Sequence, residues 1–216
     1  MKILYYLLMF TCLMVFLCCR KHLGKSLFLM GPLLICSISV ELVTEYQRKF
    51  LHVHDWYQYH IFQPVEFILI TLLFYANMKS DAIRTVMLVS IPVFLIVIIS
   101  YYLVHPQSFN SEKFIDFQLE SFFLIIWAIL YLVELINTDH VIDSILLIPF
   151  FWISFAVLLF FSGNMFIMGF RDFLAKHHAG VRNTIMLVPQ YLNLIFYFMI
   201  IVGFLCKFTR KKSFSA

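Results

Sequence analysis

Charge is what this sequence has little of. Only 13% of its 216 residues are charged and 62% are apolar, whereas soluble domains carry roughly 25% charged and about 45–50% apolar residues. A soluble fold of this length could not bury so much apolar surface. The composition therefore excludes a free-standing soluble domain and predicts a surface that faces lipid.

The usual patterns of metal, disulfide and nucleotide sites are also missing. The chain has no CxxC, HxxxH or HExxH pattern and no nucleotide-binding glycine pattern, and its five cysteines lie in or at the ends of apolar segments. No disulfide framework or zinc site is predicted. The 16 Lys and Arg residues against 12 Asp and Glu gather in short loops and the tail, which suits membrane topology better than nucleic-acid binding. We expect no metal, no cofactor and no nucleic-acid partner.

Apolar runs of the length that crosses the hydrocarbon core, about 20 residues, follow one another along the whole chain. The first run lacks a small-residue cleavage site and is followed by Arg20 and Lys21, so we expect a retained helix and not a signal peptide. The sequence predicts an all-α polytopic membrane protein, a single bundle of about seven transmembrane helices (1–206) with a short basic cytoplasmic tail (207–216). The predicted spans are 3–19, 27–45, 59–77, 85–104, 116–135, 147–169 and 184–206.

Lysines and arginines indicate the orientation, because they favour the cytoplasmic side of membrane proteins. With the N-terminus outside, nine of the 16 basic residues fall on the cytoplasmic side. The densest basic groups, in the first loop and in the C-terminal tail, agree with this choice. We predict a multi-pass protein of the inner membrane with its N-terminus outside and its C-terminus in the cytoplasm.

Polar residues are spread unevenly over the spans. In an up-and-down bundle, the ends of the even-numbered spans share one side with the starts of the odd-numbered spans. Most of the intramembrane acids, amides and histidines lie in these stretches. Residues three or four positions apart share a helix face, so we expect these groups to face a common interior. The candidate ligand-binding residues of this cavity are Glu41, His60, Gln63, Glu66, Glu120, Asn164, Gln190 and Asn193.

Depth in the bilayer separates the acids. Glu66 and Glu120 are the deepest carboxylates. An ionised carboxylate at the bilayer centre costs at least ~2.5–3.5 kcal/mol, so we expect both to face a cavity or a partner, or to be protonated. Asp116 and Glu45 lie nearer the interface, where solvation by water is expected. Four further histidines are expected to be solvated in loops: His52, His54, His177 and His178.

Several functions are compatible with this polar side. The favoured interpretation is recognition: a cavity open to the extracytoplasmic side, with Arg171 at its rim, binds a small molecule or lipid, and the protein senses or signals to a membrane partner. A second is membrane-embedded lipid hydrolysis, with Glu66 or Glu120 as general base and His60 as proton shuttle or metal ligand. In a third, the polar side chains only hold the bundle together, and a fourth is transport or proton movement. The residues favour no enzyme, and the catalytic residues are unknown.

A family resemblance is carried by five stretches, in this order: SISVELVTEY, HIFQPVEFILITLLFY, FQLESFFLIIWAILY, FFWISFAVLLFFSGNMF and YLNLIFYFMIIVGF. Through them the chain resembles an uncharacterised family of small bacterial seven-helix integral membrane proteins. The resemblance implies the same fold and polar cluster, through the VEF, LES, FSGN and LNxxFY elements that carry Glu66, Glu120, Asn164 and Asn193. It implies no reaction. Members of that family often carry a histidine shortly before the last asparagine, where this chain has Pro189, which weakens a catalytic histidine pair. A more distant likeness to lysoplasmalogenase-type membrane hydrolases rests on size and intramembrane acids.

Overall fold

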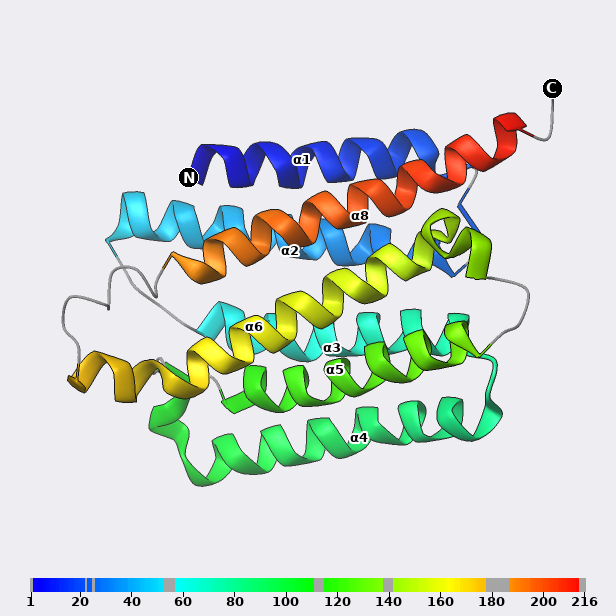
Figure 1. Cartoon of the computed structure of the whole chain (residues 1–216). Helices are drawn as coiled ribbons and strands as arrows, with labels where there is room; N and C mark the ends of the chain where they lie inside the picture. The colour runs from blue at the N-terminus through cyan, green and yellow to red at the C-terminus, as the bar shows by residue number, and fades with distance from the viewer. Residues whose placement is uncertain are drawn as a thin grey trace.

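The computed structural model describes residues 2–21, 23–24, 26–52, 57–110, 115–137, 142–177 and 187–213, and these residues fold into an up-and-down helical bundle (Figure 1). Six helical stretches are long and apolar enough to cross a membrane, and α1 is a shorter apolar helix. The prediction of an all-α membrane bundle is confirmed. The elements are α1 (Lys2–Cys19), η1 (Leu27–Leu29), α2 (Met30–Tyr46), η2 (Gln47–Leu51), α3 (Tyr57–Asn77), α4 (Asp81–Val104), η3 (Pro106–Asn110), α5 (Ile115–Ile136), η4 (Ile142–Leu147), α6 (Pro149–His177) and α8 (Val188–Ser213).

The helices agree with the predicted spans to within a few residues at most ends. The fourth helix begins earlier, at Asp81, and α6 begins at Pro149, a residue suited to the first helical position because it lacks a backbone donor. Two helices extend beyond the predicted spans. α6 continues to His177, and α8 continues to Ser213 through most of the segment predicted as a tail. The predicted start of the last span, at residue 184, lies outside the described residues.

Helix contacts follow a closed ring. α1 packs on α2, α2 on α3, α3 on α5, α5 on α6, α6 on α8 and α8 on α1, whereas α4 packs outside the ring against α3 and α5. α4 is accordingly the least buried of the candidate spans. Its outward face carries exposed apolar side chains such as Val89, Ile96 and Leu103. Such a face is expected to contact lipid.

Large aromatic side chains fill the interior between the helices. Phe67, Phe94 and Phe161 are fully buried, and the rings of Phe67 and Phe94 lie 4.2 Å apart between α3 and α4. At the α6–α8 contact, Gly203 lets the two helices approach closely: a Cβ there would lie 2.9 Å from the carbonyl oxygen of Pro149. The core therefore fixes how the helices that carry the polar residues are placed.

One end of the bundle carries the starts of α1, α3, α5 and α8 and the ends of α2, α4 and α6 (Figure 1). We call it the polar end, because the polar candidates of the sequence lie on these stretches. The other end carries the junction between α3 and α4. There the Glu134 carboxylate accepts hydrogen bonds from the backbone N–H groups of Lys79 (3.1 and 3.2 Å) and Ser80 (3.1 Å).

Candidate functional site

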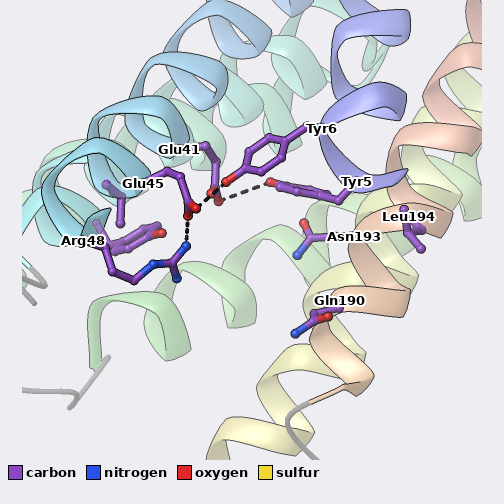
Figure 2. A pocket seen from close by; sticks show the side chains of 10 residues that line it. Tyr5, Tyr6, Glu41, Glu45, Arg48, Gln190, Asn193 and Leu194 are labelled. Atoms are coloured by element: carbon purple, nitrogen blue, oxygen red, sulfur yellow. Dashed lines mark hydrogen bonds and ion pairs between the residues drawn. The ribbon is translucent and has the colours of Figure 1, made fainter. Parts of the chain in front are cut away.

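A cavity of about 170 Å³ lies at the polar end between α1, α2 with η2, α3 and α8 (Figure 2). It is partly open to the surroundings. Polar side chains from all four helices surround it, so it is unlike the apolar gaps between membrane helices. Its described lining consists of Tyr5, Tyr6, Glu41, Thr44, Glu45, Arg48, Tyr59, Gln190, Asn193 and Leu194.

Two acids one helical turn apart form the α2 side of the cavity. Glu41 accepts a hydrogen bond from the Tyr5 hydroxyl at 3.2 Å, and Glu45 accepts one from the Tyr6 hydroxyl at 3.5 Å. Figure 2 shows both tyrosines reaching from α1 toward the carboxylates. Glu45 also pairs with Arg48, which lines the cavity. Because Glu41 and Glu45 are four positions apart and share a helix face, both acids reach the cavity.

Salt bridges and partial burial change the expectation for Glu45. Its side chain is 17% exposed and also pairs with the Lys49 ammonium, whose Nζ lies 3.1 Å from Oε1. The structure therefore adds protein partners to the solvation by water that was expected for Glu45. This carboxylate is held between α1 and two basic residues that follow it on the same helical stretch.

Amide side chains of α8 form the opposite side of the cavity. Gln190 and Asn193 lie one turn apart near the start of the helix, below Tyr5 in Figure 2. Asn193 donates its amide to the carbonyl of Pro189 at 3.1 Å, which orients the side chain and leaves its oxygen directed away from that bond. The amide side thus offers both hydrogen-bond donors and acceptors.

A second polar group, separate from the cavity lining, is buried between α3, α4 and α5. His60 Nδ1 lies 2.6 Å from Asp116 Oδ2, and the Tyr102 hydroxyl donates to the same oxygen at 2.8 Å. With its amide nitrogen turned toward Asp116, Gln63 donates to Oδ2 at 2.5 Å and to Oδ1 at 2.9 Å. The backbone N–H of Phe117 adds a bond to Oδ1 at 3.0 Å. We call His60, Gln63, Tyr102 and Asp116 the Asp116 cluster.

Burial of Asp116 is complete, with no part of the residue exposed. The expectation that water solvates it is therefore wrong. Asp116 comes second in α5, but α3 and α4 cover it at that depth, and several donors replace water around its carboxylate. A buried acid with this many partners is the usual way in which a folded protein accommodates a charge.

Glu120 and Glu66 lie next to the Asp116 cluster. Glu120 is fully buried one turn after Asp116, and neither of its carboxylate oxygens has a hydrogen-bond partner among the described residues. Glu66 is half-buried, and its carboxyl group interacts electrostatically with Glu120 and with Tyr197. The two deepest carboxylates of the sequence are therefore neighbours, on facing helices.

The eight candidate residues thus lie in three places. Glu41, Gln190 and Asn193 line the cavity; His60 and Gln63 belong to the Asp116 cluster, with Glu66 and Glu120 beside it. Asn164 is buried and donates its amide to the carbonyl of Phe160 in its own helix at 2.9 Å. Their roles in ligand binding stay predictions.

Some expectations fall outside the described part of the chain. The side chains of Arg171 and His177 are not described, and His54 and His178 lie outside the described residues. His52 is exposed and ends η2 in the left-handed backbone region, with a φ of 52°. Among the described residues, no three His, Cys, Asp or Glu side chains form a group that could hold a metal ion.

Sequence reasoning missed the tyrosines of the site. Tyr5, Tyr6 and Tyr59 line the cavity and Tyr102 completes the Asp116 cluster. Tyrosines near the ends of membrane helices are common at the lipid interface, so their position in the sequence does not by itself indicate a binding site. The three- and four-residue spacings from Glu45 to Arg48 and Lys49 were local signs that this carboxylate is paired.

Comparisons with models of known families, with curated proteins and with solved structures find no match for this chain.

Proposed function

We propose that this chain is a sensor-like protein of the bacterial inner membrane that recognises a small molecule or a lipid headgroup in the cavity at its polar end. The observation that carries the proposal is the convergence of polar side chains from four helices on one cavity of about 170 Å³. Polar groups that converge on a concave site fix the orientation of a bound ligand and supply its specificity. The positive-inside rule puts this end on the extracytoplasmic side.

Recognition fits this cavity better than transport, because the cavity lies near one end of the bundle. Its walls belong to helices that also run to the opposite end, where α1 ends and the C-terminal part of α8 lies (Figure 1). A ligand that binds one arrangement of these helices more tightly shifts the bundle toward that arrangement. A change at the polar end is thereby passed to the cytoplasmic end, where a membrane signalling partner would read it.

The test is native mass spectrometry of protein extracted from its own membranes in mild detergent. Asn193→Trp would fill the cavity, and Ile195→Trp, two positions further on α8 and 44% exposed outside the cavity, is its matched control. We expect a bound molecule on the wild type and on Ile195→Trp that is absent from Asn193→Trp. Equal occupancy of all three proteins, or no bound molecule on any, would contradict the proposal.

Lipid hydrolysis remains a second candidate because of the pair formed by His60 and Asp116. A carboxylate that orients a histidine at 2.6 Å is the arrangement of a general base with its orienting group. His60 is only 2% exposed, so a substrate needs an opening between α3 and α5 to reach it. Release of lysolipid or fatty acid by the wild type and not by His60→Gln, in purified protein, would favour this candidate. Intact lipids in both samples would leave the Asp116 cluster as a contact that holds the bundle together.

A further inference from the structure

We infer that the cavity selects a small organic ammonium ion, either free or as the headgroup of a lipid. The inference rests on the proposed function and specifies its ligand class. Two carboxylates, Glu41 and Glu45, line the cavity, and Arg48 is the one basic residue among its described lining residues. Arg48 and the adjacent Lys49 are both bound to Glu45 in ion pairs, so we assign the attraction for a cation to Glu41, which accepts the Tyr5 hydroxyl. An anionic ligand would meet the Glu41 carboxylate directly, whereas a cation is attracted by it.

Tyrosine rings supply the second feature of a site for ammonium ions. Tyr5 and Tyr6 line the cavity with ring centroids 5.4 Å apart and ring planes inclined by 52°, and Tyr59 adds a third ring from α3. Inclined aromatic rings around a small cavity resemble the aromatic cages that bind methylated ammonium groups, where a cation lies within about 6 Å of each ring centroid. The lining is therefore suited to an alkylated cation more than to a strongly hydrated metal ion.

Hydrogen bonds hold the acids in the orientation that such a cation needs. The hydroxyls of Tyr5 and Tyr6 donate to Glu41 and Glu45 at 3.2 and 3.5 Å. A carboxylate offers roughly four acceptor positions, so a bond from a tyrosine is compatible with a further contact to an ammonium group. In Figure 2 the two carboxylates lie side by side between the tyrosines and Arg48. The α1 tyrosines thus act as positioning residues for the acids as well as walls of the cavity.

Size restricts the ligand further. The cavity measures about 170 Å³, close to the roughly 150 Å³ of an engineered cavity that holds benzene. A group of up to about ten non-hydrogen atoms therefore fits, which includes choline and ethanolamine but excludes a whole lipid. The amides of Gln190 and Asn193 on the opposite wall can bind the hydroxyl or phosphate oxygen that such a headgroup carries.

The first experiment compares choline with 3,3-dimethyl-1-butanol, its uncharged carbon analogue, on lipid-free wild-type protein in detergent. Binding is measured by isothermal titration calorimetry. We expect choline to bind at least about tenfold more tightly than the uncharged analogue, because the charge and cation–π contacts that the analogue lacks commonly contribute about that much. Equal binding of both probes, or tighter binding of an anion such as glycerol 3-phosphate, would overturn the ammonium assignment while the recognition function stands.

Three variants test whether choline binds in the cavity. Glu41→Gln should weaken choline binding about tenfold and leave the uncharged analogue unchanged, and Asn193→Trp should abolish binding of both. Asp81→Asn, which removes a carboxylate that is 93% exposed at the opposite end, is the control and should change neither. Choline binding that persists in Asn193→Trp would place the ligand elsewhere and overturn the inference. If no probe binds and the native protein also carries no molecule, both the inference and the proposed function fail.

The source of the ammonium group is tested in nanodiscs. Wild-type protein in phosphatidylcholine or phosphatidylethanolamine discs is compared with protein in phosphatidylglycerol discs by thermal unfolding, each with and without free choline. A stabilisation by the two ammonium lipids that Asn193→Trp abolishes would identify a headgroup ligand. Stabilisation by free choline alone, equal in all three lipids, would identify a free amine. Either result supports the ammonium class, and a preference for phosphatidylglycerol would overturn it.

Discussion

His60 Nδ1 and Asp116 Oδ2 lie 2.6 Å apart in a place where neither side chain is exposed. The contact joins α3 to α5, and the Tyr102 hydroxyl, which lies 2.8 Å from His60 Nδ1 as well as from Asp116, adds α4 to it. Because α4 packs only on the outside of the ring, this group attaches the end of α4 by polar contacts, as the Glu134 carboxylate does at its start. The Asp116 cluster should therefore contribute strongly to stability.

Asp116→Asn tests that contribution. The substitution removes the charge and places amide hydrogens against donors of His60, Gln63 or Tyr102, and breaking a buried charged contact costs about 3–5 kcal/mol. For a chain of this length we expect the unfolding temperature in detergent to fall by roughly 6–20 °C. The matched control is Asp81→Asn, whose ion pair with Arg84 is at the surface and should contribute under about 1 kcal/mol. Equal shifts in the two variants would show that the cluster does not stabilise the fold.

The sequence was sufficient to predict the up-and-down path of the chain and the gathering of polar residues at one end of the bundle. Apolar runs of membrane-spanning length separated by short charged loops leave few alternatives to an up-and-down bundle. The partners of Glu41 and Asp116 were not predictable in the same way. Tyr5 is 36 positions from Glu41, and Tyr102 is 14 positions from Asp116 on another helix, so each contact depends on which helices are neighbours. The order of helices around the ring is a property of packing, and no periodicity in one span specifies it.

Glu134 is expected to stabilise the start of α4. Its carboxylate accepts the backbone N–H groups of Lys79 and Ser80, and the Ser80 side chain itself makes no capping bond. Acceptors at a helix start typically contribute about 0.5–2 kcal/mol. Glu134→Ala should lower stability by that amount and speed amide hydrogen exchange at the start of α4. The exposed Asn137→Ala, one turn further along the chain, is the control; unchanged exchange in Glu134→Ala would contradict the capping role.

Gly203 and Gly169 form a matched pair for the packing of α6 and α8. A Cβ at Gly203 would lie 2.9 Å from the Pro149 carbonyl oxygen, whereas a Cβ at Gly169 meets nothing within 4 Å. Gly203→Ala should therefore force the helices apart and cost about 1–3 kcal/mol. Gly169→Ala should be neutral or gain up to ~1 kcal/mol from helix propensity. Thermal unfolding of both variants checks the difference, and equal stability would show that the α6–α8 contact is not tightly packed at Gly203.

The side of the membrane that the cavity faces is tested by labelling single cysteines. In a variant with all five native cysteines replaced, Ser108→Cys marks η3 at the polar end, and Ser80→Cys marks the junction between α3 and α4 at the other end. With the N-terminus outside, a membrane-impermeant maleimide should label Ser108→Cys in intact cells and Ser80→Cys only after permeabilisation. The loops are short, so a single residue at each end reports the orientation of the whole bundle. The reverse pattern would place the cavity on the cytoplasmic side, where its ammonium ligand would have to come from the cell interior or the inner leaflet.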